Sequence, residues 1–316
     1  MPIGISPLVD FAFKLMLASR GHERVTIHFL NAILGDKVKI VNIEIENPYV
    51  GPNFEGDKWV VLDILATDER GRKFNIEMQT SIPPGLRQRL AFYDARLYVE
   101  QLRQGDQYHE LLPAIVICVL DKPLLSDCDN LHTDFRLRDE FGRVFTDDLQ
   151  IHVLELTKLT VTRENLKSAI PAERWAYFLL NAENLTVAEI RELFHDPEFA
   201  EAAGVLEMIK DNPDQMSDYI SRLKYKLDEG WRIESTRAEA LREGREEGLR
   251  EGLKEGELKG EKHGVLRGEL IGQIVILQEL LGMTEPGRED LSKYDAIQLK
   301  DLCSQFRLQL RSRQSN

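Results

Sequence analysis

Residues 60–79, VVLDILATDERGRKFNIEMQ, are the stretch that decides the fold of this chain. Two runs of strand-like composition, 58–67 and 72–79, flank the polar turn 68–71, and this pattern predicts a β-hairpin. The first run carries apolar residues at both odd and even positions, so both faces of the strand are apolar. This pattern is typical of a strand that is covered on both sides. The hairpin is therefore predicted to belong to a buried sheet.

Two acidic side chains of this hairpin are candidate metal ligands. A hairpin centred near Arg70 places Asp63 opposite Glu77, with Cβ atoms about 5 Å apart, and two carboxylates at that separation can share one divalent cation. A carboxylate buried at Asp63 costs several kcal/mol unless it is paired or binds a metal. The alternative is a pair of solvated acids, and a register shift of one residue moves Glu77 to the other face.

The first 160 residues alternate helix-like and strand-like segments, which predicts a mixed α/β domain. A loop rich in Pro, Gly and Asn at 47–56 precedes the hairpin, and Pro83-Pro84-Gly85 separates the hairpin from the next helix. The expected helices are 7–18, 23–34 and 86–104, and the expected strands are 40–46, 58–67, 72–79, 113–120 and 149–156.

Residues 161–232 contain only helix-like segments and no catalytic cluster. We expect them to form a separate helical domain, whose role is either simple packing or the positioning of DNA or a partner. The expected helices are 172–182, 186–194, 198–211 and 214–229.

A four-residue glycine repeat marks residues 233–272. On a helix, period four moves successive glycines by about 40°, so they form a slowly winding stripe. Each glycine costs about 1 kcal/mol relative to alanine, which favours a second copy packed along the stripe over a solitary helix. The alternatives are a flexible charged tether and a membrane GxxxG helix, and the charged residues between the glycines exclude the latter. The repeated residues are Gly244, Gly248, Gly252, Gly256, Gly260, Gly264, Gly268 and Gly272.

Residues 273–316 are predicted to form a small C-terminal helical domain. Ile274, Leu277 and Leu281 share one apolar face, and a second helix-like segment follows from about Ile297. The basic residues at the end of the chain are expected to be exposed.

Composition limits the classes of function. The chain has 316 residues, 42% of them hydrophobic, which is enough for two domains with a substantial core. Its three cysteines show no paired spacing, and neither a secretory signal nor a membrane-spanning stretch is present, so a cytoplasmic setting is expected. The net charge of −13 argues against indiscriminate binding of DNA, because Lys and Arg make the phosphate contacts.

A local basic stripe can still contact nucleic acid. Arg89, Arg96 and Arg103 recur every seven residues, so they share one face of the helix expected at 86–104. The alternative is the solvated face of an amphipathic helix. Beside a metal-carboxylate site, phosphate contact by Arg89 becomes the better interpretation, and Arg96 is the next candidate.

A series of short motifs follows the order found in one known family, and the chain resembles the Rpn recombination-promoting nucleases, also described as PD-(D/E)XK nuclease-family transposases. The resemblance covers about residues 6–160. The motifs that carry it are Asp10-Phe11-Ala12-Phe13-Lys14, Phe29-Leu30-Asn31-Ala32-Ile33-Leu34, Asp63-Ile64-Leu65, Ile76-Glu77-Met78-Gln79, Arg89-Leu90-Ala91-Phe92-Tyr93, Arg96-Leu97-Tyr98, Gly105 with Tyr108, and Pro113-Ala114-Ile115-Val116-Ile117.

The resemblance implies a restriction-endonuclease-like αβββαβ core that cleaves DNA with Mg²⁺ or Mn²⁺. Asp63 and Glu77 would be metal ligands, with the backbone carbonyl of Met78 as a further ligand, and Asp10 would be a supporting acid. Gln79 stands where the general motif has lysine, and a neutral amide can orient water or phosphate only by hydrogen bonds.

These observations, together with the resemblance, predict a metal-dependent deoxyribonuclease of the recombination-promoting or transposase-like type, with DNA recombination as the associated process and with a helical and oligomeric C-terminal half. The competing hypothesis is a catalytically decayed DNA-binding or assembly protein on a nuclease-like core. Gln79 and the acidic net charge keep this second hypothesis open, whereas the presence of both Asp63 and Glu77 argues against it.

Overall fold

The computed structural model describes residues 1–35, 39–46, 49–50, 60–61, 64–283 and 288–314. The chain divides into two compact units, Met1–Trp231 and Arg232–Asn316, which are described separately. The first unit is mixed α/β, and the described part of the second contains only helices. This confirms the predicted α/β region followed by a helical half, and it is consistent with a restriction-endonuclease-like fold.

A six-stranded sheet forms the centre of the first unit. Its strands are β1 (Ile43–Glu46), β4 (Ile64–Asp68), β5 (Lys73–Gln79), β6 (Ala114–Leu120), β7 (His132–Arg138) and β8 (Val144–Glu155), and a separate pair consists of β2 (Tyr49–Val50) and β3 (Val60–Val61). The order across the sheet is β1-β4-β5-β6-β8-β7. Neighbouring strands pair antiparallel except at β5, β6 and β8, which are parallel.

The predicted hairpin is present as β4 and β5. These strands pair antiparallel with Ile64 opposite Ile76, a register centred on Arg70 as the sequence indicated. Asp63 lies outside the residues that the structure describes, so its position opposite Glu77 stays a prediction.

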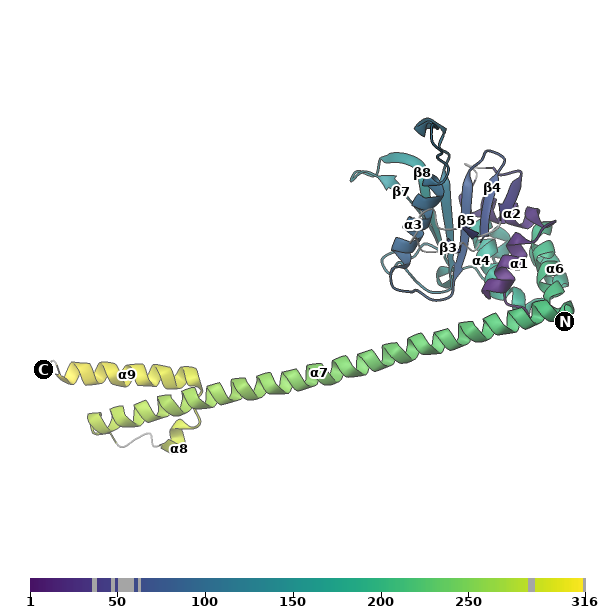
Figure 1. Cartoon of the computed structure of the whole chain (residues 1–316). Coiled ribbons are helices and arrows are strands. Elements are labelled where there is room, and N and C mark those ends of the chain that lie inside the picture. Colours follow the sequence, from purple (N-terminus) through teal and green to yellow (C-terminus); the bar gives the residue numbers. More distant parts are fainter. Residues whose placement is uncertain (36–38, 47–48, 51–59, 62–63, 284–287, 315–316) are drawn as a thin grey trace. The chain divides into compact units, whose positions relative to one another are not determined.

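Helices cover both faces of the sheet. The α-helices are α1 (Asp10–Ala18), α2 (Glu23–Leu34), α3 (Leu86–Val99), α4 (Pro171–Asn181), α5 (Val187–Leu193) and α6 (Pro197–Asp211), and short 3₁₀ turns occur at Tyr108–Glu110, Leu156–Lys158, Leu166–Ser168 and Ala182–Asn184. Helices α1, α2, α4 and α6 lie on one side of the sheet and α3 lies on the other (Figure 1).

Successive side chains along each strand point to opposite faces of the sheet, so the same strands contribute to an apolar layer on each face. Ile76 and Ile117 belong to the large cluster formed with α1, α2, α4 and α6, whereas Cys118 packs with Leu90 of α3 on the opposite face. Trp175 of α4 is fully buried in the large cluster. Since α4 and α6 share this cluster with the sheet, the hydrophobic core is continuous across the domain boundary expected after residue 160.

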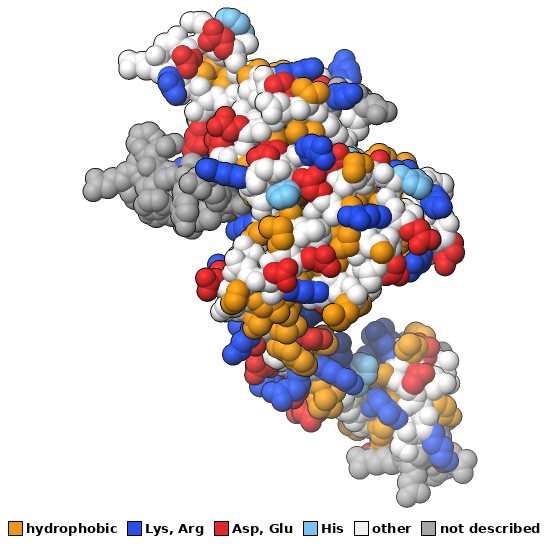
Figure 2. Space-filling model, turned by 90° about the vertical axis from the view of Figure 1, so that its right-hand side faces the viewer, with side chains coloured by type: hydrophobic (Ala, Val, Ile, Leu, Met, Phe, Trp, Pro, Cys, Tyr) orange, Lys and Arg blue, Asp and Glu red, His pale blue; other side chains and the backbone are white. Residues whose placement is uncertain are grey.

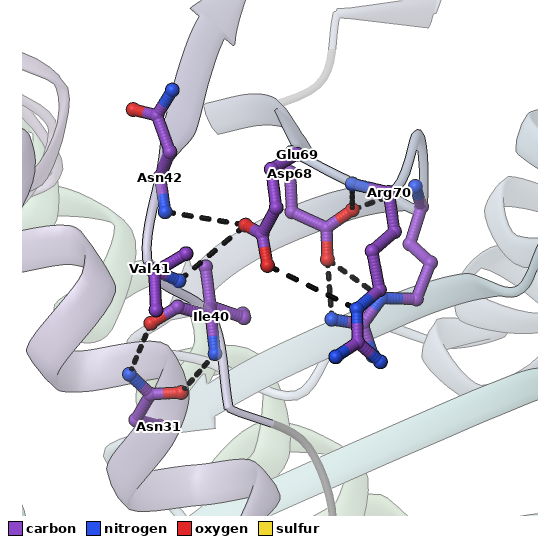
Figure 3. A network of polar contacts seen from close by, with 8 residues as sticks. Asn31, Ile40, Val41, Asn42, Asp68, Glu69 and Arg70 are labelled. Atoms are coloured by element: carbon purple, nitrogen blue, oxygen red, sulfur yellow. Dashed lines mark hydrogen bonds and ion pairs between the residues drawn. The ribbon is translucent and has the colours of Figure 1, made fainter.

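A polar network joins α2 to the turn between β4 and β5 (Figure 3). The side chain of Asn31 accepts a hydrogen bond from the N–H of Ile40 at 2.8 Å and donates one to its carbonyl at 2.9 Å. The carboxylate of Glu69 accepts from the N–H groups of Val41 and Asn42 at 3.4 and 3.2 Å. These contacts fix the segment that enters β1, so Asn31 has a structural role.

Within the sheet and its covering helices, the clearest differences from the sequence expectation are at α3, β7 and β8. Helix α3 ends at Val99 instead of 104, and β8 begins at Val144, five residues before the strand expected at 149. Strand β7 was not predicted, because its two large apolar side chains, Phe135 and Leu137, are both substantially exposed and alternate with charged residues. A strand at the edge of a sheet with one open face gives no strong apolar pattern.

Helix α7 runs from Pro213 to Leu281 and contains all eight glycines of the repeat. In the second unit, Ile274 and Leu281 of α7 pack with Leu299 and Phe306. The other helices of this unit are α8 (Arg288–Leu291) and α9 (Ala296–Gln314). Among the described residues, no helix combines the length and apolar character that crossing a membrane requires.

Candidate active site

Glu77 lies in the middle of the sheet, on β5 between β4 and β6. Its side chain is almost completely buried, with 2% of the residue exposed. One carboxylate oxygen, Oε1, accepts a hydrogen bond from Asn75 Nδ2 at 3.0 Å, and the other, Oε2, lies 3.6 Å from Arg89 Nη2 on α3. A buried carboxylate requires a compensating positive charge, and Arg89 supplies one in this structure.

The guanidinium of Arg89 is only partly satisfied. Its 3.6 Å separation from Glu77 is within ion-pair range but is too long for a hydrogen bond. Accordingly, Arg89 Nε and Nη2 are buried without a hydrogen-bond acceptor among the residues that the structure describes. The guanidinium also lies over the ring of Tyr93, at 5.9 Å from its centroid. Arg89 thus retains donors that an oxyanion could use.

Asp10, Met78 and Gln79 meet at a polar pocket of about 240 Å³ beside the end of β5. The Asp10 carboxylate accepts a hydrogen bond from the N–H of Phe11 at 2.8 Å and lies 3.7 Å from Arg222 Nη1 of α7. The structure therefore brings Asp10, the acid expected to support the site, and Gln79 to one pocket, while Glu77 lies two residues before Gln79 on β5.

Arg96 has a partner on its own helix. Its Nε donates a hydrogen bond to Glu100 Oε1 at 2.6 Å, and 12% of its side chain is exposed. This ion pair competes with any phosphate contact. Arg89 lies seven residues earlier on α3, and its guanidinium faces Glu77. Phosphate binding by Arg96 stays a prediction.

The oxygen donors at this site match part of what a divalent cation requires. Mg²⁺ prefers carboxylate and carbonyl oxygens, and Glu77 and Met78 offer these donor types. In the described part of the chain no group of three or more His, Cys, Asp or Glu side chains converges on one point. Glu77 and the Met78 carbonyl thus fit the ion by chemistry, and Asp63, the second carboxylate expected from the sequence, lies outside the described residues.

Several residues around the site were not identified from the sequence. Asn75 is fully buried and donates to Glu77, and its place two residues earlier on the same strand face was the available indication. Lys226 of α7 lines the pocket with Gln79. Asp121 follows β6, and its N–H donates to the carbonyl of Gln79 at 3.1 Å. Only the tertiary fold brings the last two to β5.

A second polar cluster joins two histidines at the edge of the sheet. His132 Nε2 and His152 Nδ1 are 3.0 Å apart, on the neighbouring strands β7 and β8. Burial and the adjacent His132 lower the pKa of His152 to about 4. Both rings face one another at the edge of the sheet, and neither lines the pocket at Gln79.

Comparison with known protein families places the first unit in context. A family model described as PD-(D/E)XK nuclease family transposase matches residues 7–236, which is more than half of the chain. Comparisons with curated proteins and with solved structures give no match. The matched range contains the whole six-stranded sheet, the candidate site and the first part of α7.

Proposed function

The chain belongs to the PD-(D/E)XK nuclease family transposases, and from this premise we propose that it is a Mg²⁺-dependent DNA endonuclease of the recombination-promoting type. The observation that carries the proposal is the buried Glu77 carboxylate with the unsatisfied guanidinium of Arg89 facing it. An isolated acid and base buried for stability alone would be expected to form a close hydrogen-bonded pair.

Each residue has a distinct role in this proposal. Asp63, Glu77 and the carbonyl of Met78 would hold the ion, which when bound would lower the pKa of a water and supply positive charge at the scissile phosphate. The amide of Gln79 orients the water or a phosphate oxygen by hydrogen bonds. Arg89 donates its free N–H groups to phosphate, and Asp10 is the supporting acid at the end of β5.

Binding of DNA must rely on discrete contacts. On the face drawn in Figure 2, basic and acidic side chains are interspersed over the first unit, and no broad area carries basic residues alone. This distribution agrees with a net charge of −13. Affinity then depends on a few cations close to the site, such as Arg89, rather than on a general electrostatic surface.

The test is plasmid nicking by the full chain with Mg²⁺, Mn²⁺, Ca²⁺ or EDTA. The proposal requires nicking with Mg²⁺ or Mn²⁺ and none with EDTA. Full activity in EDTA, or no activity with any metal on plasmid, would reject a metal-dependent endonuclease.

The second candidate is a catalytically decayed DNA-binding or assembly protein. The observation in its favour is that Arg89 already supplies a positive charge 3.6 Å from Glu77, where an active site would use a metal ion. Titration of Mg²⁺ by calorimetry separates the two, because the decayed protein has no need to bind the ion at Glu77.

We also propose that the protein is a homo-oligomer that is joined through the glycine stripe of α7. The support is that each of the eight repeat glycines, from Gly244 to Gly272, is open: an added Cβ meets no atom within 4 Å beyond the adjacent residues and nearby backbone of the helix itself. Large apolar side chains such as Leu249 and Leu253 are also exposed on this helix, at 66% and 62%. Two copies would allow cleavage of both DNA strands.

A further inference from the structure

One side of the pocket beside β5 is formed by residues of α7, which lie outside the sequence motifs that indicate a nuclease. Its volume is about 240 Å³, and four of its lining residues come from the first part of α7, within the first unit. The family match also extends to residue 236 and so includes this part of the helix. The lining residues are Leu8, Asp10, Met78, Gln79, Thr80, Ser81, Arg222, Tyr225, Lys226 and Glu229.

Lys226 occupies a position that the packing of α7 would normally give to an apolar residue. Met216, Tyr219 and Leu223 pack against the core at helical spacing, and Lys226 is the next residue on that face. Tyr219 fixes the helix, because its hydroxyl accepts a hydrogen bond from the N–H of Ser6 at 2.9 Å. A lysine on the core-facing side of a docked helix, with 26% of its side chain exposed, indicates a use for its charge.

The amine of Lys226 is held at the pocket by two contacts. Its Nζ donates to the carbonyl of Leu8 at 3.1 Å and lies 3.7 Å from Asp121 Oδ2. An ammonium has three N–H donors, so these contacts leave one for a ligand in the pocket. The second basic residue of the lining, Arg222, is 3.7 Å from Asp10 and shares its charge with that acid.

The remaining lining groups match the parts of a nucleotide. Thr80 and Ser81 bring hydroxyl groups and Gln79 brings an amide, all suited to phosphate or sugar oxygens. The ring of Tyr225 is 67% exposed and is available to stack on a base. Asp10 and Glu229 balance the two cations, so the pocket favours a singly charged phosphodiester over a free, highly charged anion.

We propose that this pocket binds one nucleotide of the DNA strand next to the candidate catalytic residues, with Lys226 and Arg222 at its phosphate and Tyr225 against its base. The inference rests on the proposed function, since it assumes that the ligand of the site is DNA. It assigns to α7 a direct part in holding the substrate strand, in addition to its role as the connection between the two units.

The test measures binding of a short labelled single-stranded oligonucleotide to the full chain by fluorescence anisotropy, in EDTA so that no metal-dependent cleavage occurs. Lys226→Met should weaken binding and lower the slope of log affinity against log salt by about 1, because one phosphate contact is lost. Tyr225→Ala should weaken binding at least about 5-fold while leaving that slope unchanged.

Two further variants control for a general loss of charge and for misfolding. Lys224→Met removes the same charge from an exposed position of α7 outside the pocket and should leave affinity and slope unchanged. Glu229→Gln removes an acid from the lining and should tighten binding, an effect that misfolding cannot produce. Equal losses in Lys226→Met and Lys224→Met, or unchanged binding in Tyr225→Ala, would overturn the assignment of the pocket.

Plasmid nicking distinguishes a failure of this inference from a failure of the proposed function. A parent that nicks plasmid, with pocket variants that bind DNA as the parent does, rejects the pocket and retains the nuclease. A parent that binds DNA with the expected variant effects but never nicks retains the pocket and rejects the nuclease. A parent that neither binds nor nicks DNA rejects both.

Discussion

Glu77 and Arg89 form a pair whose geometry can be tested residue by residue. The acid is held by Asn75 on its own strand, and the guanidinium comes from α3 across the face of the sheet. Because the two groups are 3.6 Å apart, substitution of Glu77 does not break a hydrogen bond to Arg89. Substitutions at Glu77 should therefore affect chemistry more than folding.

The first prediction concerns the metal ligands. Glu77→Ala and Asp63→Ala should each lower Mg²⁺-dependent plasmid nicking by at least about 100-fold, because a ligand matters more than the outer contacts that already cost 10–100-fold. The measurement is nicking rate, with thermal unfolding to show that the variants are folded. Glu44→Ala, an exposed acid on β1 of the same sheet, is the control. A folded Glu77 variant that nicks at the parental rate would show the site to be misassigned.

The second prediction separates the role of Gln79 from that of the metal ligands. Gln79→Lys should keep or raise the nicking rate, because a cation there can stabilise charge that develops on the phosphate. Gln79→Ala should lower the rate while calorimetry shows unchanged Mg²⁺ affinity. Gln88→Lys, which adds the same charge at an exposed position of α3, should have no effect. Loss of Mg²⁺ binding in Gln79→Ala would contradict this division of roles.

The third prediction uses the buried acid Asp94 on α3. Burial raises the pKa of its carboxyl from 3.8 to about 8, although the backbone of Gln150 donates to it. The folded protein therefore keeps a proton that the unfolded chain loses near pH 4, so this residue lowers stability as pH rises from about 4 to 8.

Asp94→Asn should remove that dependence. The variant should gain little stability over the parent near pH 5 and more near pH 8, measured by chemical denaturation at both values. The exposed Asp129→Asn should show no such difference. A gain that is equal at the two pH values, or that is larger at the lower one, would mean that Asp94 is not a protonated buried acid.

At the scale of elements, the sequence predicted the helices and strands that are marked by a regular apolar pattern and by turn residues at their ends. The hairpin register followed from the position of the turn, and β6 followed from an apolar run that is buried at every residue. Strand β7 was missed because its apolar side chains remain exposed at the sheet edge. Composition cannot identify a strand that is held mainly by the backbone of its neighbour.

The candidate site was predictable in part for a similar reason. Glu77 and Gln79 lie two residues apart on one strand, so alternation placed them on the same face. Lys226 is about 150 residues away in the chain, and no local pattern connects it to Gln79. Long-range placement of this kind depends on how α7 docks on the core, which a single sequence does not specify.

The fourth prediction concerns the glycine repeat as an element. Since an added Cβ at Gly252, Gly256 or Gly260 meets no atom within 4 Å, alanine at these positions creates no clash within the chain. The triple alanine variant should gain helicity by circular dichroism and stabilise α7 by about 1 kcal/mol for each residue. Gly282→Ala should do the opposite, because this glycine has a φ of 67° that alanine rarely adopts. Helicity that does not rise in the triple variant would contradict this prediction.

At the scale of the whole molecule, the stripe raises the question of assembly. Helix α7 has 69 residues, and eight glycines leave its backbone open along one winding line. The stripe turns by about 40° every four residues, so a straight partner helix can follow it only over a short crossing. Close backbone approach at such a crossing can offset the cost of several glycines, as small-residue interfaces do.

The fifth prediction tests assembly by placing large side chains at three glycines of the stripe. Leucine at Gly252, Gly256 and Gly260 should lower the mass of the particle in light scattering from an oligomer to a monomer, because branched side chains prevent the helices from approaching. Leucine at Glu247, Lys254 and Glu261, which lie at least about 100° around α7 from each of the three glycines, adds similar bulk and should leave the oligomer intact. A parent that is monomeric at micromolar concentration, or a glycine-stripe variant of unchanged mass, would leave the stripe as a solvent-exposed surface. In that case two-strand cleavage would have to proceed by successive nicks from one copy, which plasmid assays can distinguish by the accumulation of nicked circles before linear product.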